Sequence, residues 1–181
     1  MDARAAEIAK YRAVYAKHES YRCHEDRLRP VATALHGLSG SLLDVSCGRG
    51  ELMREAMRMG FGPVGGTEAV PALCGGGVVE AQIHALPFAD QSWDHVTCID
   101  VLEHLLEADI VPGLLELQRV TRKTLLLAAA DYRTMWDGVE LHPSARPYDA
   151  WDALFRRTLS GRIEWAGATP TSEMWRVTYG G

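Results

Sequence analysis

The sequence predicts a single α/β domain with a doubly wound, mostly parallel sheet and a C-terminal antiparallel hairpin. Strand-like and helix-like segments alternate repeatedly between residues 41 and 130, as they do in parallel sheets. Residues 161–180 alternate around a Gly/Pro turn, which is typical of a hairpin. The chain has 181 residues, 47% of them hydrophobic and 24% charged, and it contains no linker or low-complexity tract. This length suffices for one domain with its own core.

The N-terminal residues 5–36 are rich in Ala, Glu, Arg and Leu, a composition that predicts helix. Pro30 is expected to begin a second helix over residues 30–37, because proline is favoured in the first helical turn. Residues 1–37 would then form a helical lid on the domain. Three tyrosines of this segment are expected to pack against the core, with a closing contact over a ligand as the alternative: Tyr11, Tyr15 and Tyr21.

Residues 38–130 are predicted to form the core that binds a ligand. The expected elements are a buried strand at 41–46, a helix at 50–59, a strand that ends at Glu68, a strand within 78–83, a strand at 94–101, a helix at 102–121 and a strand at 123–130. Three consecutive glycines at 75–77 limit any helix after Glu68 to about one turn. Pro112 is expected to begin the main part of the helix at 102–121.

Residues 131–181 are predicted to contain an irregular substrate loop, an amphipathic helix at 147–159 and the terminal hairpin. Trp165 and Trp175 are expected in the core of that hairpin. The segment SEMWRVTY, residues 172–179, suits either a homodimer contact or an edge strand of the sheet.

A glycine-containing turn lies where the first core strand passes into its helix. The stretch LLDVSCGRGEL, residues 42–52, places Gly48 and Gly50 after an apolar run that contains Asp44. Ligands of open α/β sheets bind at the carboxyl ends of the strands, where glycine lets them approach the backbone. Glu68 follows Gly48 by 20 residues, at the end of the next strand, and suits the two hydroxyls of a ribose. Together these residues predict a nucleoside-bearing cofactor.

The charge and spacing of this turn disfavour a dinucleotide. The dinucleotide fingerprint has a third glycine where this chain has Met53, and the acidic Glu51 at the start of the helix would repel a pyrophosphate. Asp44 can pair with a cationic group. A zwitterionic, sulfonium-bearing ligand therefore fits better, and a dinucleotide-dependent oxidoreductase is the alternative.

These motifs resemble those of class I S-adenosylmethionine-dependent methyltransferases, whose fold is Rossmann-like. Residues 42–52 are similar to the first motif of that family, and PVGGTEAV, residues 63–70, looks like the second. The stretch IHALPFADQSWDHVTCIDVLEHL, residues 83–105, is similar to the later motifs almost throughout. The resemblance spans residues 35–130, and it implies a small single-domain enzyme that transfers a methyl group.

The resemblance implies that S-adenosylmethionine is held at the ends of the strands. Glu68 would hold the ribose hydroxyls, while Gln82 by its side chain and Ile83 by its backbone N–H would meet the adenine edge. Asp100 and Val101 would lie near the methionine part. The full implied set is Asp44, Ser46, Cys47, Gly48, Gly50, Glu68, Ala69, Gln82, Ile83, Asp100, Val101 and Leu102.

Three departures from the family pattern concern this site. Ser46 replaces the first glycine of the turn, Gln82 stands where Asp is more frequent, and LCGGG at residues 73–77 replaces a helix. The first two leave a further alternative, which is a catalytically silent protein that binds S-adenosylmethionine or serves as a scaffold.

Methyl transfer is an in-line displacement, so the protein chiefly aligns the acceptor and removes its proton when the acceptor is a hydroxyl. His104 follows the strand at 94–101 and His142 lies in the loop after the strand at 123–130, so both are expected at one edge of the sheet. They are the candidate bases, with packing or a solvated loop position as alternatives. Asp131 would orient one of them or the acceptor.

Composition argues against several classes of partner. The net charge is −5 without a basic cluster, which disfavours nucleic acid. The N-terminus lacks an apolar signal region, and no apolar run approaches the roughly 18 residues of a spanning helix, so a cytoplasmic setting is expected. The four cysteines form no CxxC pair, and the sequence predicts no metal site. A small or medium-sized acceptor, by analogy a sugar or sugar nucleotide, is expected.

Overall fold

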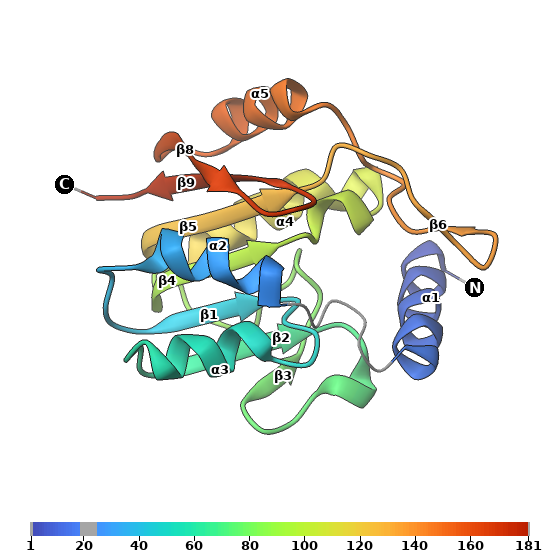
Figure 1. The fold of residues 1–181 in the computed structure, drawn as a ribbon, viewed down its shortest axis with the longest axis horizontal. Coiled ribbons are helices and arrows are strands. Elements are labelled where there is room, and N and C mark those ends of the chain that lie inside the picture. Colours follow the sequence, from blue (N-terminus) through green and yellow to red (C-terminus); the bar gives the residue numbers. More distant parts are fainter. Residues whose placement is uncertain (1, 19–24, 181) are drawn as a thin grey trace.

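The computed structural model describes residues 2–18 and 25–180 and contains a seven-stranded sheet with helices on both faces (Figure 1). The predicted position Tyr21 lies outside the described residues. The strand order is β3-β2-β1-β4-β5-β9-β8. The strands are β1 (Leu42–Val45), β2 (Val64–Glu68), β3 (Val78–Glu80), β4 (Trp93–Ile99), β5 (Thr121–Ala129), β8 (Arg162–Ala168) and β9 (Glu173–Thr178).

The pairing of these strands confirms the predicted doubly wound sheet. Strands β1 to β5 pair in parallel, while β9 runs antiparallel to both β5 and β8. The chain leaves β1 towards β3 and then returns to β4 on the other side of β1. The topological switch point, where open α/β sheets bind their ligands, therefore lies between β1 and β4.

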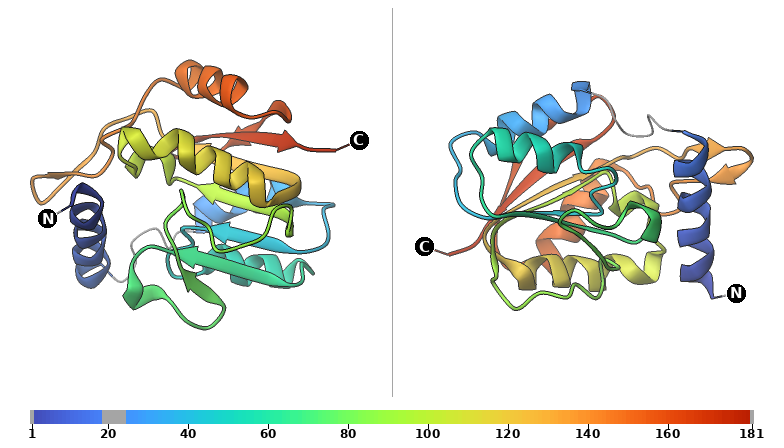
Figure 2. Two further views of the ribbon diagram at one scale, coloured as in Figure 1. Left: turned by 180° about the vertical axis from the view of Figure 1, so that it is seen from behind. Right: turned by 90° about the horizontal axis from the view of Figure 1, so that it is seen from below.

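Helices cover both faces of the sheet. The helices are α1 (Ala3–Lys17), α2 (Glu25–Leu35), α3 (Glu51–Arg58), α4 (Glu107–Val120) and α5 (Tyr148–Thr158), with single 3₁₀ turns η1 (Pro71–Leu73) and η2 (Leu102–His104). Helices α2 and α3 lie on one face and α4 and α5 on the other (Figure 2). Leu125 and Leu127 of β5 pack towards α4 and α5, whereas Leu126 and Ala128 pack towards α2 and α3. Burial on both faces explains why β5 is apolar without alternation.

Two expectations about proline are wrong. Pro30 lies inside α2 and Pro112 inside α4, although each was expected to begin a helix. A proline inside a helix forfeits one backbone hydrogen bond and crowds the preceding turn. In α4 the apolar face continues across Pro112, with Ile110 and Leu114 both buried, so packing on the sheet offsets this cost.

The terminal hairpin is confirmed, but its two tryptophans differ in their exposure to solvent. Trp175 on β9 is buried, whereas Trp165 on β8 is 64% exposed, which corrects its expected place in the hairpin core. Strand β9 lies between β5 and β8, so residues 172–179 form neither an edge strand nor an exposed dimer contact. The edge strand of this side is β8. The loop 131–147, expected to be irregular, contains a small hairpin of β6 (Met135–Trp136) and β7 (Val139–Glu140).

Helix α1 lies across the carboxyl ends of the strands, beside the β6–β7 hairpin (Figures 1 and 2). Polar contacts hold it there: Arg4 forms an ion pair with Asp109 of α4 at 2.5 Å, and Lys10 Nζ donates to the carbonyl of Glu140 at 3.0 Å. None of the helices in the described part of the chain is long and apolar enough to cross a membrane.

Candidate active site

The glycine turn after β1 has a left-handed backbone at three positions. The φ angles are 58° at Ser46, 57° at Gly48 and 73° at Gly50, the N-cap of α3. Glycine adopts this conformation without strain, whereas Ser46 adopts it at a cost that local contacts must offset. A Cβ atom built on Gly48 would lie 2.9 Å from Tyr15 Oη, so both the backbone angle and the space at this position favour glycine.

The Glu68 carboxylate ties this turn to the end of β2. Its Oε2 accepts the backbone N–H of Gly48 at 2.9 Å, and its Oε1 accepts those of Ala69 at 2.8 Å and Val70 at 3.1 Å. Glu68 is 5% exposed. A carboxylate offers about four lone-pair sites, so these three bonds leave capacity for a hydroxyl donor. The geometry fits the role of ribose ligand that the sequence motif implies.

Two cavities meet at this edge of the sheet, and both are lined by Tyr15 and Ser46. The larger measures about 770 Å³, including its opening to solvent, and lies under α1. Six of the implied cofactor residues line it: Ser46, Glu68, Ala69, Gln82, Ile83 and Val101. The smaller measures about 550 Å³. Five of the implied residues line that one: Asp44, Ser46, Cys47, Gly48 and Asp100.

Four of the predicted site residues line neither cavity: Gly50, Leu102, Asp131 and His142. Gly50 shapes the turn through its left-handed backbone, and Leu102 is fully buried in the apolar core. The side chain of Asp131 is exposed and neighbours Tyr148, where burial and then the Asp131 carboxylate raise the pKa of Tyr148 to about 12. The structure therefore does not bring Asp131 to the histidines.

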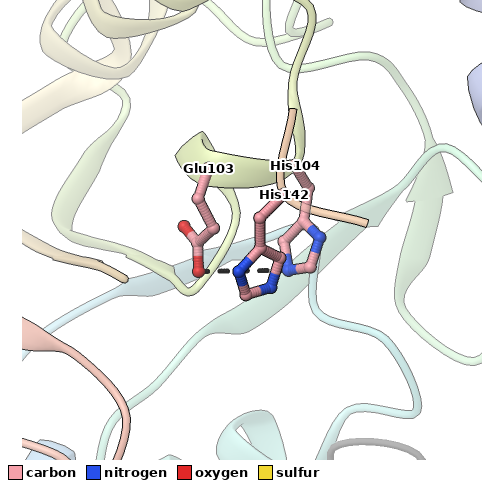
Figure 3. A group of neighbouring side chains, drawn as sticks. All are labelled: Glu103, His104 and His142. Atoms are coloured by element: carbon pink, nitrogen blue, oxygen red, sulfur yellow. Dashed lines mark ion pairs between the residues drawn. The ribbon is translucent and has the colours of Figure 1, made fainter. Parts of the chain in front are cut away.

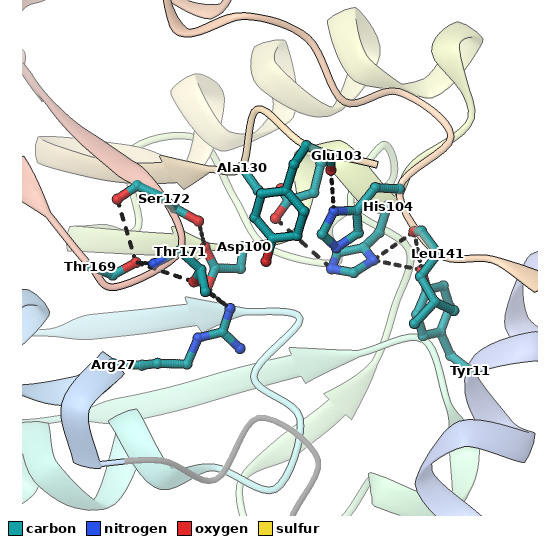
Figure 4. A network of polar contacts seen from close by, with 12 residues as sticks. Tyr11, Arg27, Asp100, Glu103, His104, Ala130, Leu141, Thr169, Thr171 and Ser172 are labelled. Atoms are coloured by element: carbon teal, nitrogen blue, oxygen red, sulfur yellow. Dashed lines mark hydrogen bonds and ion pairs between the residues drawn. The ribbon is translucent and has the colours of Figure 1, made fainter. Parts of the chain in front are cut away.

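Asp100, at the end of β4, is held by groups that sequence reasoning did not single out. It is 2% exposed and has a left-handed φ of 54°. Arg27 of α2 pairs with its Oδ2 at 2.8 Å, and the Ser172 hydroxyl donates to its Oδ1 (Figure 4). Arg27 also donates to the Thr171 hydroxyl at 2.7 Å. Helix α2 and the β8–β9 turn thus fix the wall of the smaller cavity.

Acidic side chains outnumber basic ones around both cavities, although Arg4 lines the larger cavity and Arg27 and Arg49 line the smaller one. Asp44, Asp100 and Glu68 line them, and Asp44 accepts a hydrogen bond from Thr97 at 2.7 Å. Their summed potential favours a cationic group such as a sulfonium or an ammonium. Burial, followed by the charges of Asp44 and Glu68, raises the pKa of Cys47, so this thiol stays protonated and is not a nucleophile.

His104, His142 and Glu103 gather beside the larger cavity. The side chains point towards one another, with Glu103 and His104 on η2 and His142 on the 131–147 loop (Figure 3). The imidazole centroids are 4.5 Å apart, and Glu103 Oε1 lies 3.9 Å from His104 Nε2. The backbone N–H of Ser144 donates to the carbonyl of Glu103 at 3.1 Å, which anchors the loop on η2.

The hydrogen bonds of the two imidazoles fix their tautomers. His104 Nδ1 lies 2.8 Å from the carbonyl oxygen of Leu141, and His142 Nδ1 lies 2.7 Å from that of Tyr132. A carbonyl only accepts, so each Nδ1 carries a proton, and Nε2 is the ring atom that can accept a proton when the imidazole is neutral. Tyr11 Oη of α1 also contacts His104 Nδ1, at 2.6 Å (Figure 4). Tyr11 was predicted to pack or to close over a ligand, whereas Glu103 was not predicted as a functional group.

Comparison with known proteins agrees with this geometry. Residues 43–128 match a family model described as a methyltransferase domain. The chain is similar in structure to the PH0226 protein of Pyrococcus horikoshii OT3, with a TM-score of 0.74, 14% identity and coverage of 93% of this chain and 99% of that one. Among curated proteins no match is found.

Two further solved structures are similar. The 1,6-didemethyltoxoflavin-N1-methyltransferase of Burkholderia thailandensis, with bound 1,6-didemethyltoxoflavin and S-adenosylhomocysteine, has a TM-score of 0.76, 15% identity and coverage of 98% of this chain and 89% of that one. A complex of the Haloferax volcanii Trm112 methyltransferase activator with a methyltransferase has a TM-score of 0.68, 14% identity and coverage of 96% of each chain. At these identities the likeness shows the fold.

Proposed function

We propose that this chain is a class I S-adenosylmethionine-dependent methyltransferase and that it methylates a hydroxyl group of a small or medium-sized acceptor. The first candidates are sugars and sugar nucleotides. The observation that carries the proposal is the pair of adjacent imidazoles, His104 and His142, of which His104 lines the larger cavity. A hydroxyl must lose its proton during methyl transfer, whereas a neutral amine attacks with its own lone pair.

The residues around the two cavities fit S-adenosylmethionine. The Glu68 carboxylate, already fixed by three backbone N–H groups, would accept the ribose hydroxyls. Gln82 and Ile83 line the larger cavity at the place where the adenine is expected. Asp44 and Asp100 line the smaller cavity and would face the cationic part of the cofactor. When bound, the cofactor supplies an electrophilic methyl group.

The chain's own groups would then orient the acceptor and take its proton. His104 Nε2 or His142 Nε2 would accept the hydroxyl proton, since both Nδ1 atoms are engaged with carbonyls. Helix α1 would close the larger cavity as a lid, because Tyr11 and Tyr15 line it and Tyr11 contacts His104. Such closure excludes water. Water would otherwise solvate the nucleophile and compete with the substrate hydroxyl for the imidazole that takes its proton.

A nitrogen acceptor is the alternative, because the Burkholderia thailandensis structure of similar fold is of an N1-methyltransferase. The test is a transfer assay with methyl-labelled S-adenosylmethionine on two matched acceptor panels, one of sugars and sugar nucleotides and one of heterocyclic amines. The proposal predicts labelled product in the first panel only. Labelled product in the second panel alone would show that the acceptor atom is nitrogen and would refute the proposal of a hydroxyl acceptor.

The histidines provide the matched variants for that assay. His142→Gln and His104→Gln are expected to lower kcat by about 10²–10⁴-fold, the usual contribution of a positioned base. His36→Gln is the control, because His36 is exposed on the turn after α2. Unchanged kcat in both His142→Gln and His104→Gln would show that neither imidazole takes part in the reaction.

A further inference from the structure

We propose that Glu103, His104 and His142 form a binding site for one divalent transition-metal ion beside the cofactor cavity. The three side chains are 1%, 9% and 6% exposed. Each offers one ligand atom, and these atoms all lie within 4.8 Å of one another. Two imidazoles and one carboxylate form a ligand set that divalent transition metals prefer, and Figure 3 shows the three side chains converging.

The surroundings of the two imidazoles match those of metal ligands. A ligating histidine almost always donates its other ring N–H to a carbonyl or a carboxylate, which fixes the ring and directs the lone pair to the metal. His104 donates to the carbonyl of Leu141 and His142 to that of Tyr132, at 2.8 and 2.7 Å. With each Nδ1 on a carbonyl, Nε2 is the ring atom that each imidazole would turn to an ion shared with Glu103.

Binding requires a modest contraction of the group. Nitrogen and oxygen ligands lie about 2.0–2.2 Å from zinc, so neighbouring ligand atoms of a tetrahedral site are about 3.4 Å apart. The separation of Glu103 Oε1 and His104 Nε2 is 3.9 Å. Rotation of the side chains can close this difference, because Glu103 and His104 share the η2 turn and His142 stands on a loop.

The ligand set also limits which ions can bind and what the bound ion can do. Imidazole ligands suit zinc, iron and nickel, and the carboxylate admits manganese, while magnesium and calcium prefer oxygen ligands only. Three protein ligands leave coordination positions open, as in catalytic sites. His104 lines the larger cavity, so these positions are reachable from the place where the acceptor is expected.

The role of the ion rests on the proposed function, although the site itself does not. The acceptor hydroxyl would bind the ion through its oxygen, and the ion would lower the pKa of that hydroxyl. The proton would pass to water at the opening of the larger cavity to solvent. The oxygen would then form a bond to the methyl carbon as the carbon–sulfur bond breaks, and sulfur would keep the electron pair. With the ion bound, the two imidazoles would serve as its ligands, and the proton-acceptor role proposed for them would apply to the chain without the ion.

The test measures binding of Mn²⁺ by the full chain. Binding is monitored through the loss of the electron paramagnetic resonance signal of free Mn²⁺, and Zn²⁺ binding is measured by equilibrium dialysis. Wild type is expected to bind one ion per chain. His142→Ala and Glu103→Gln are expected to weaken binding more than about tenfold, because removing even an outer-shell partner costs this much. The exposed-histidine variant His36→Ala is expected to bind as wild type does.

The proposal is overturned if wild type binds neither ion at one per chain, or if His142→Ala and Glu103→Gln both bind as well as wild type. Glu103→Gln keeps the size of the side chain, and circular dichroism confirms that each variant is folded. Calorimetry with S-adenosylhomocysteine on the same samples separates the two proposals. Ion binding without cofactor binding would refute the cofactor site alone, and cofactor binding without ion binding would refute the metal site alone.

Discussion

Gly48→Ala tests whether the turn after β1 lies against the ligand. At a φ of 57°, alanine costs about 1–2 kcal/mol relative to glycine. The new methyl group would also lie 2.9 Å from Tyr15 Oη, which must shift, and would project into the smaller cavity that Gly48 lines. We expect a lower melting temperature and at least tenfold weaker binding of S-adenosylhomocysteine, which is about 1.4 kcal/mol.

Gly76→Ala is the matched control for this variant. Its φ is 58°, and among the described residues no heavy atom lies within 4 Å of a Cβ built there. The backbone cost is therefore the same, without the contact. For a chain of this size each kcal/mol lowers the melting temperature by about 2–4 °C.

The two variants are compared by thermal unfolding and by calorimetric titration with S-adenosylhomocysteine. Both are expected to lose about 2–8 °C, but only Gly48→Ala should lose affinity. Equal affinity of Gly48→Ala and Gly76→Ala for S-adenosylhomocysteine would refute the placement of the ligand against this turn.

Three further variants test the site and the fold. Arg27→Ala leaves the buried Asp100 carboxylate without its ion pair and should lower the free energy of unfolding in urea by about 3–5 kcal/mol. Asp100→Asn should lower it less, since Asn tolerates the left-handed backbone of this position. Tyr11→Phe removes the hydroxyl that contacts His104 and should lower kcat about tenfold, with little change in S-adenosylhomocysteine affinity in calorimetry. A backbone N–H donor and then basic neighbours lower the pKa of Asp94 to about 2, below its unfolded value of 3.8. The stabilisation by its carboxylate is thus full above about pH 4 and is lost towards pH 2, so the unfolding free energies of wild type and Asp94→Asn should converge by about 1–2 kcal/mol between pH 6 and pH 2.

The local parts of the site could be predicted from the sequence because they are set by neighbouring residues. The order strand, glycine turn, helix at residues 42–58 follows from the apolar run, the glycines and the amphipathic stretch that succeeds them. Glu68 could be placed because the carboxyl ends of parallel strands meet at one edge. The same rule brought His104 and His142 together from segments far apart in the chain.

The parts that could not be predicted depend on tertiary contacts. Arg27 reaches Asp100 only because α2 packs beside the β8–β9 turn, and no local pattern records that contact. Asp131 follows the apolar end of β5, but its side chain is exposed and interacts with Tyr148, a contact that no local pattern records. The proposed metal-ligand set could not be predicted because Glu103 and His142 have no characteristic sequence spacing.

The central claim is that the two cavities bind S-adenosylmethionine through Glu68. The most direct measurement is calorimetric titration of wild type and Glu68→Ala with S-adenosylmethionine and S-adenosylhomocysteine, with circular dichroism to confirm folding. The account predicts binding of both compounds by wild type, weakened by about 2 kcal/mol or more in Glu68→Ala, the scale of a pair of charge-assisted hydrogen bonds. Absence of binding by folded wild type, or equal affinity of folded Glu68→Ala, would contradict it.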